Sequence, residues 1–305
     1  MGNVHFLGGL KIDLFKKYNK KKRIKKADKF FNQGKYQKAL EIYDEILKDD
    51  SNDSSAWFGK GVSLSNLEEY KEGLKAFEKV LELDPKYPDA EYYKAISLSY
   101  LGEYNLALEA YDKALKLEPE NMEVWFNKGY TAVDAEEYQE ALEAYDKFLE
   151  LEPDNSDGWF EKGYTLNELE RYDDALKAYD KGMELYSEEP KSWFNRANPL
   201  RNLGKLEEAI KSYDKTLELE PDYTNGWYMR GMVLGQIGKT QEALESYNKA
   251  LELEPLKADA WYGKSEIFQK LNNDQEALKC LNKALELKPD CEVAKKAKEK
   301  ILNQL

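Results

Sequence analysis

The chain has 305 residues, of which 34% are charged and 42% are hydrophobic, and its formal net charge is −13. An acidic surface lacks the cations that displace counterions from phosphates, so the body of the protein is not expected to bind nucleic acid. No apolar run approaches the ~20 residues of a membrane-spanning helix, which argues against a transmembrane segment. With a mean hydropathy of −0.80, these values predict a soluble protein with a large surface for its core.

The chain begins with residues 1–19, which we expect to form a basic tail or helix. Residues 11–26 contain nine Lys or Arg side chains and one acidic residue, Asp13. Three interpretations of this basic stretch remain: contact with anionic lipid or nucleic acid, a solvated helix that extends into the next segment, or contact with the acidic body of another copy. The start has no basic region ahead of a long apolar run, so no signal peptide is expected.

A 34-residue period runs through the rest of the chain. Tryptophans recur at this spacing from Trp57 to Trp261, and only Glu91 interrupts their series. Prolines follow the same period, with Ser187 in the one missing place. With position 1 at Lys20, the sequence divides into eight ungapped repeats: 20–53, 54–87, 88–121, 122–155, 156–189, 190–223, 224–257 and 258–291. A period in this range is typical of solenoids, in which each repeat buries its apolar face against its neighbours.

Each repeat contains two predicted helices. In the first, apolar or small residues at positions 4, 8 and 11 form one stripe, and glycine at position 15, as in Gly34, suits a left-handed helix end. The second has its stripe at positions 17, 20, 24, 27 and 28, and proline at position 32 ends it. Position 8 is small in every repeat, although glycine inside a helix costs ~1 kcal/mol. This choice predicts close helix packing, with the aromatic residues at positions 4 and 24 in the core.

The last segment, residues 292–305, is predicted to form a helix that caps the final repeat. Val293, Ala297 and Ile301 share one apolar face, which would cover the exposed end of the array. The only cysteines, Cys280 and Cys291, lie close to this end. A secreted disulfide scaffold would contain more cysteines, so a reducing cytoplasm is expected.

These features resemble the tetratricopeptide repeat family. Residues 125–153 and 227–255 carry Trp, Gly, Ala, Tyr and Pro at the family's spacings, and the resemblance covers residues 20–291. It implies an all-α, right-handed superhelical solenoid of antiparallel helix pairs with a C-terminal capping helix. Position 7, commonly leucine in the family, is Lys or Arg here from the second repeat onwards. Such long side chains can lie over apolar surface while their charges stay in water.

In this family, ligands usually lie along a concave groove lined by positions 2, 6, 9 and 13 of the first helices. These positions share one helical face that excludes the core stripe. Tyrosines and methionines are rare on an ordinary solvated face, which favours a binding surface here. The candidate partner-binding residues, including one neighbour at position 12, are Tyr93, Tyr100, Asn127, Tyr130, Glu161, Tyr164, Lys191, Asn195, Asn198, Arg201, Met229 and Met232.

The candidate groove changes in character along the chain, from tyrosine-rich to acidic, then to amide and basic, then to methionine-lined. Its acidic centre suggests a partner segment that contains Lys or Arg. Some family members hold a partner's C-terminal carboxylate through Lys at position 5 and Asn at position 9, with basic residues two repeats on. Position 5 is aromatic in this chain from Phe58 onwards, so that set is incomplete and that kind of receptor is disfavoured.

Pro199 lies inside the first predicted helix of the sixth repeat. A proline there removes one helical hydrogen bond and clashes with the carbonyl four residues back, which belongs to Asn195. In one interpretation, a kink frees this carbonyl for an extended ligand. In the other, the kink has no function and is tolerated because neighbouring repeats hold the helix in place.

No catalytic signature accompanies the repeats. The only histidine is His5, and no Gly-rich phosphate loop, Ser/His/Asp set or metal-spaced cluster occurs. We therefore expect no enzymatic activity, no cofactor and no metal site. The leading hypothesis is a cytoplasmic scaffold that binds an extended or helical segment of a partner protein in its groove. The alternative is a nucleic-acid or anionic-membrane adaptor that acts through residues 11–26. The oligomeric state is left open.

Overall fold

The computed structural model describes residues 19–87 and 89–304. The predicted basic tail, except for its last residue, lies outside these residues, as do His5 and the first part of the basic stretch 11–26. The chain forms two compact units, which divide between Pro153 and Asp154.

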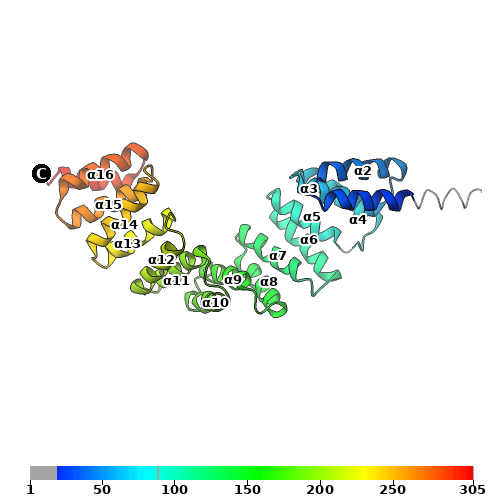
Figure 1. Ribbon diagram of the computed structural model, residues 1–305. Helices are drawn as coiled ribbons and strands as arrows, with labels where there is room; N and C mark the ends of the chain where they lie inside the picture. Colours follow the sequence, from blue (N-terminus) through cyan, green and yellow to red (C-terminus); the bar gives the residue numbers. More distant parts are fainter. Residues whose placement is uncertain (1–18, 88, 305) are drawn as a thin grey trace, which may run out of the picture. The chain divides into compact units, whose positions relative to one another are not determined.

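Unit 1 begins with residues 19–31, which are helical. Its further helices are α2 (Tyr36–Asp49), α3 (Ser54–Asn66), α4 (Tyr70–Leu83), α5 (Ala90–Tyr100), α6 (Tyr104–Leu117), α7 (Met122–Asp134) and α8 (Tyr138–Leu151). They are coloured from blue to green in Figure 1. The two helices expected in each repeat are thus present, and the odd-numbered ones from α3 onwards are the first helices of their repeats.

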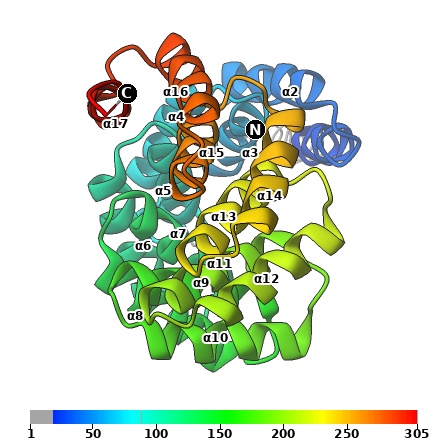
Figure 2. The same ribbon diagram turned by 90° about the vertical axis from the view of Figure 1, so that its left-hand side faces the viewer.

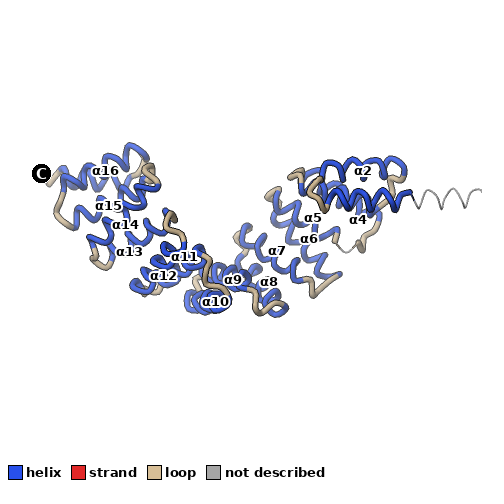
Figure 3. Tube along the Cα trace, viewed as in Figure 1, coloured by secondary structure: helices blue, strands red, loops and turns tan. Residues whose placement is uncertain are grey.

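Unit 2 continues the same alternation of first and second helices. It contains α9 (Ser156–Glu168), α10 (Tyr172–Leu185), α11 (Pro190–Asn202), α12 (Leu206–Leu219), α13 (Thr224–Gln236), α14 (Thr240–Leu253), α15 (Ala258–Lys270), α16 (Asp274–Leu287) and α17 (Glu292–Leu302). Figure 3 shows helices joined by short loops, and no strand occurs among residues 19–87 and 89–304.

Within each unit, neighbouring helices pack in sequence order. Each helix contacts the one before and the one after it, from α2 to α8 in unit 1 and from α9 to α17 in unit 2. First helices of successive repeats also touch, as in the pairs α3 with α5, α5 with α7, α9 with α11 and α13 with α15. Figure 2 shows α11, α13 and α15 in succession, with the second helices beside them. The predicted all-α solenoid of helix pairs is therefore confirmed, and its last helix, α17, packs on α16.

A residue with positive φ follows every first helix at position 15. The predicted glycines have φ between 70° and 82°, and they are Gly34, Gly102, Gly204 and Gly238. The other repeats place a residue with a side chain in the same conformation: Glu68, Glu136, Glu170 and Asn272, with φ from 54° to 63°. The following N–H then bonds to a carbonyl five residues back, as Glu137 N does to Ala132 O at 2.8 Å. The turn geometry, and not the residue type, sets this φ.

The periodic tryptophans and prolines contact each other through a hydrogen bond. Within each unit, the indole N–H of a tryptophan donates to the backbone carbonyl of position 32 in the preceding repeat. The donors and acceptors are Trp57 with Ser51, Trp125 with Pro119, Trp193 with Ser187, Trp227 with Pro221 and Trp261 with Pro255, at 2.8 to 3.0 Å. Because the acceptor is a backbone carbonyl, serine serves as well as proline. This explains why the proline series can be interrupted while the tryptophan contact persists.

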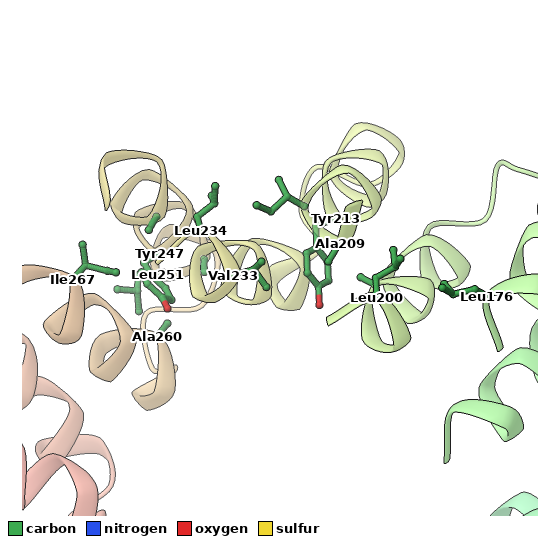
Figure 4. Close-up of a cluster of buried hydrophobic side chains, with 14 residues drawn as sticks. Leu176, Leu200, Ala209, Tyr213, Val233, Leu234, Tyr247, Leu251, Ala260 and Ile267 are labelled. Carbon is green, nitrogen blue, oxygen red and sulfur yellow. The ribbon is translucent and has the colours of Figure 1, made fainter. Parts of the chain in front are cut away.

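The core of each unit is a series of aromatic rings at position 24. None of these rings is more than 4% exposed, and they belong to Tyr43, Phe77, Tyr111, Tyr145, Tyr179, Tyr213 and Tyr247. A Cβ added at Gly61 would lie 2.6 Å from the ring of Phe77, and one at Gly129 would lie 2.7 Å from that of Tyr145. Small residues at position 8 therefore make room for these rings, as predicted. Figure 4 shows part of this core in unit 2.

The tryptophans at position 4 are only partly buried, unlike the rings at position 24. Within each unit they cover the junction between two repeats, where the N–H reaches the preceding carbonyl. Both aromatic series therefore belong to the core as expected, but the tryptophans lie at its edge. An indole that covers a junction keeps one edge accessible to water, because its N–H must reach a loop carbonyl at the surface.

The basic residues at position 7 link successive repeats. Lys60 pairs with Asp44 and Lys128 with Asp112 in unit 1, and Arg196 pairs with Asp180 and Arg230 with Asp214 in unit 2, each aspartate being at position 25 of the preceding repeat, at 2.6 to 2.8 Å. Their cations also stand over the tryptophan three residues earlier, at 5.9 Å in the case of Lys128 and Trp125. The side chains lie over apolar surface as expected. Their charges, however, are paired with carboxylates and not left in water, because position 25 is within reach.

The described part of the basic stretch also forms ion pairs. Lys20 pairs with Asp50, and Arg23 pairs with Asp49, at the end of α2. The remaining cations of residues 21–26 are exposed. Two of the basic side chains are therefore held against the first repeat, as expected for a helix that extends into it.

Candidate functional site

Positions 2, 6, 9 and 13 of the first helices form one accessible face, which we call the first-helix surface. In unit 1 it belongs to α3, α5 and α7, and in unit 2 to α9, α11, α13 and α15. Positions 2 and 13 of these helices are exposed, whereas positions 3 and 8 are buried in every one from α5 onwards. All of the candidate partner-binding residues are exposed or partly buried.

In unit 1 the first-helix surface rests on a cluster of aromatic rings. The ring of Tyr93 lies 5.3 Å from that of Phe58, edge to face, and 5.2 Å from that of Tyr92. Asn127 of α7 donates from Nδ2 to the hydroxyl of Tyr92 at 3.0 Å and to the carbonyl of Glu123 at 2.8 Å. Tyr92 therefore brings two of the predicted residues, Tyr93 and Asn127, to the same place between α5 and α7.

Two carboxylates adjoin these rings, and they have no cationic partner. Partial burial raises the pKa of Asp89, and the charges of Glu118 and Glu123 raise it further. Burial also raises the pKa of Tyr93, and Asp89 and Glu123 add to that rise. Among the described residues, no cation lies within 4.0 Å of Asp89 or Glu123. No Lys or Arg occupies the surface positions of α3, α5 and α7. The result is uncompensated negative charge beside aromatic rings.

Tyr100 and Tyr130 lie at more exposed places in unit 1. Tyr100 is 67% exposed and stacks face to face on Tyr70 of α4, with ring centroids 4.4 Å apart. Tyr130 is 50% exposed on α7. The structure thus pairs Tyr100 with a second helix, and not with the ring cluster around Tyr93.

The first-helix surface of unit 2 begins on α9, where Glu161 and Tyr164 are partly buried. Both influence the buried Tyr179 of α10. Burial is the main cause that raises the pKa of Tyr179, and Glu161, Tyr164 and Glu168 raise it further. Side chains of the surface therefore act electrostatically on the core ring of Tyr179.

On α11, the amide and basic residues predicted for the groove are present on one face. Lys191 is exposed near the start of the helix, while Asn195, Asn198 and Arg201 are partly buried. Arg201 donates from Nη1 to Asn198 Oδ1 at 3.3 Å. The helix continues past the buried Pro199 to Asn202, so the proline does not end it.

On α13, Met232 is partly buried, and Met229 packs against the edge of the core cluster of unit 2. Sequence reasoning missed the tyrosines at position 5 and the surface of the eighth repeat. Burial raises the pKa of Tyr228. The charges of Asp259 and Glu266 on α15 raise it further, and the charge of Arg201 opposes the rise. The available signal was the aromatic residue at position 5 in every repeat from the second onwards.

Within residues 19–87 and 89–304, no three His, Cys, Asp or Glu side chains are placed to hold a metal ion. No helix in that same part of the chain is long and apolar enough to cross a membrane. The first-helix surfaces offer aromatic rings, carboxylates, amides and a guanidinium. Of these groups, tyrosine rings and arginine side chains are enriched at interfaces that recognise other polypeptides.

Comparison with solved structures supports this architecture. YrrB, described as a TPR protein with an unusual peptide-binding site, is 26% identical over 63% of this chain and 99% of its own, with a TM-score of 0.55. MamA from Desulfovibrio magneticus RS-1 is 24% identical over 54% of this chain and 94% of its own, with a TM-score of 0.52. The APC/C hetero-tetramer Cut9–Hcn1 is 16% identical over 91% of this chain and 54% of its own, with a TM-score of 0.58.

Comparison of the sequence with curated proteins finds no match. A family model for the tetratricopeptide repeat matches residues 24–88, 92–156, 126–190 and 228–290, and a second one matches residues 190–223. These matches cover most of the chain and agree with the helix pairs of both units. The chain belongs to the tetratricopeptide repeat family.

Proposed function

We propose that this chain is a cytoplasmic protein-interaction scaffold, which binds an extended or helical segment of a partner on its first-helix surfaces and has no catalytic role. Membership in the family supports this function, and YrrB, a structural neighbour, is described as having a peptide-binding site. The surfaces themselves determine which chemistry the partner segment must have.

For unit 1, the partner segment carries Lys or Arg. The observation behind this proposal is the half-buried ring of Tyr93 beside two unpaired carboxylates, Asp89 and Glu123, on a surface that has no Lys or Arg. A cation placed over a tyrosine ring gains ~1 kcal/mol or more once it is desolvated. The same cation would neutralise Asp89, whose ionised form is destabilised by desolvation and by the charges of Glu118 and Glu123. A basic side chain satisfies both groups at once.

The test starts from a library of random dodecapeptides, from which binders to the full chain are selected. We expect the selected peptides to be enriched in Lys and Arg. The variant Asp89→Asn/Glu123→Gln should lose this enrichment, because it removes both charges and keeps the shape of the surface. With a labelled selected peptide, Tyr93→Ala should weaken binding by about tenfold, as expected for loss of an aromatic anchor at an interface.

A matched control removes the same charge elsewhere in unit 1. Glu109 and Glu143 are exposed on the second helices α6 and α8, so Glu109→Gln/Glu143→Gln should leave peptide selection and affinity unchanged. If the wild-type chain selects no basic peptides, or if both double variants behave alike, the proposal for unit 1 is wrong.

The alternative adaptor function through residues 11–26 has less support. Lys20 and Arg23 already pair with carboxylates at the end of α2, which reduces the charge that this stretch presents to phosphates. Neutralising residues 20–26 and deleting residues 1–19 should therefore leave peptide selection unchanged.

A further inference from the structure

Arg201 differs from the other arginines of the chain in having no acidic partner. Each of the others forms an ion pair with an aspartate, and they are Arg23, Arg171, Arg196 and Arg230. Among the described residues, no carboxylate lies within 4.0 Å of Arg201, and its hydrogen bond to Asn198 Oδ1 is long, at 3.3 Å. A partly buried guanidinium usually finds a carboxylate, because its fork of donors matches two carboxylate oxygens.

A buried hydroxyl lies next to this guanidinium. Tyr213 of α12 is fully buried, and Arg201 is the polar group that acts on its hydroxyl. Burial raises the pKa of Tyr213, and the charge of Arg201 and a hydrogen bond from it oppose that rise. Figure 4 shows the ring of Tyr213 between the helices that carry Leu200 and Val233, which are α11 and α13. The guanidinium of Arg201 therefore lies at the edge of the core of unit 2, beside a buried hydroxyl and without a carboxylate partner.

The remaining polar groups of α11 share this face. Lys191, Asn195, Asn198 and Arg201 follow one another at spacings of four, three and three residues, which keeps them on one side of the helix. Because Asn198 Oδ1 accepts from Arg201, its amide nitrogen is left to donate elsewhere. Tyr228 of the neighbouring first helix, α13, is acted on by Arg201 and by Asp259 and Glu266 of α15, but neither carboxylate pairs with Arg201.

We propose that Arg201 and Asn198 form a subsite on α11 for a carboxylate of the bound polypeptide. The guanidinium binds the carboxylate oxygens, and the Asn198 amide donates a further hydrogen bond. Lys191, at the start of the helix, adds positive charge. This subsite rests on the proposed function and extends it, because its ligand has the opposite charge to the ligand of unit 1. It also differs from the family's carboxylate-binding set described above, since Arg201 occupies position 12.

The carboxylate can come from an Asp or Glu side chain or from a C-terminus, and the experiment separates these sources. Peptides selected from the dodecapeptide library on the full chain are resynthesised with each acidic residue changed to its amide, and separately with an amidated C-terminus. Arg201→Gln should weaken binding of the carboxylate peptide by about tenfold, the usual size of a charge-assisted contact, and should not affect the corresponding amide peptide. The peptide change that abolishes the effect of Arg201→Gln identifies the source.

Two further variants make the outcome specific to this site. Lys205→Gln removes the same charge at an exposed position beyond the end of α11, and it should leave the affinity unchanged. Glu266→Gln should raise the affinity for the carboxylate peptide, because it removes a negative charge that acts, like the charge of Arg201, on Tyr228 of α13. Thermal unfolding of each variant, with Arg201→Lys as a conservative change, verifies that the fold is retained.

The inference is overturned if Arg201→Gln weakens the carboxylate and amide peptides equally, or weakens neither. If the Asp89 and Glu123 variants still alter selection in that case, only the subsite on α11 is wrong. If the wild-type chain selects no peptides at all, the proposed function and the subsite fail together.

Discussion

At the scale of single residues, position 15 adopts a positive φ in every repeat, whether or not the residue there is glycine. Glu136 adopts φ 60°, the same left-handed conformation that Gly102 adopts at φ 78°. A residue with a Cβ is strained there by ~1 kcal/mol, whereas glycine is not. Half of the repeats therefore tolerate a local cost that the others avoid.

Glu136→Gly should accordingly stabilise the protein by about 0.5 to 1 kcal/mol, because relief of strain exceeds the added freedom of the unfolded chain. The reverse change, Gly102→Glu, should destabilise it by a similar amount, since no atom within 4 Å would meet the new Cβ and only backbone strain is added. Urea unfolding of both variants measures the two free energies. Equal signs for the two changes would contradict this account.

At the scale of single helices, α11 departs from the pattern of its neighbours. In α3, α5 and α9, a hydroxyl at position 10 donates back to the carbonyl of position 6, as Ser63 does to Gly59 at 2.7 Å. Pro199 occupies this position in α11 and supplies neither a hydroxyl nor an N–H. The carbonyl of Asn195 therefore lacks two hydrogen-bond donors at position 10: the backbone N–H of an ordinary helical residue, and the side-chain hydroxyl present in α3, α5 and α9.

Pro199→Ala should stabilise α11 by about 1 to 2 kcal/mol, because the restored helical hydrogen bond outweighs the greater freedom of the unfolded chain. Pro199→Ser should do so at least as well, since its hydroxyl can bond back to Asn195. Chemical denaturation measures both effects. Peptide affinity decides between the two interpretations of Pro199. Unchanged affinity in the stabilised variants means that the proline has no role in recognition, whereas weakened affinity supports such a role.

At the scale of the whole molecule, burial of tyrosines couples folding to alkaline pH. Burial raises the pKa of Tyr111 to about 12, partly offset by its hydrogen bond with Thr131. Burial likewise raises the pKa of Tyr43, Tyr92 and Tyr247. In the unfolded chain these hydroxyls ionise near pH 10. The folded state therefore keeps protons that the unfolded state releases.

From this difference we expect the free energy of unfolding to be unaffected by these groups below pH 10 and to fall as pH rises above it. Ultraviolet absorbance of tyrosinate, followed together with circular dichroism, should show the buried tyrosines ionising only as the helices melt. Tyr111→Phe should make the alkaline loss of stability less steep. Complete tyrosine ionisation in a fully helical protein would contradict the assignment of these rings to the core.

Much of this protein could be predicted from its sequence, because each repeat meets nearly the same neighbours as the next. The 34-residue period located the helix pairs, and the small residues at position 8 anticipated the packing of rings such as Tyr145 on Gly129. The resemblance to the family supplied the accessible face of the first helices. The 34-residue period then identified which residues of this chain lie on that face.

What only the tertiary structure decided are the partners of side chains that meet across repeats. The period could not show that Lys128 pairs with Asp112, that Tyr100 stacks on Tyr70, or that Arg201 has no carboxylate partner. A repeating pattern specifies which face a residue occupies, since that depends on helical geometry within one segment. Contacts between segments depend on distances of a few ångströms, which arise only when the helices pack.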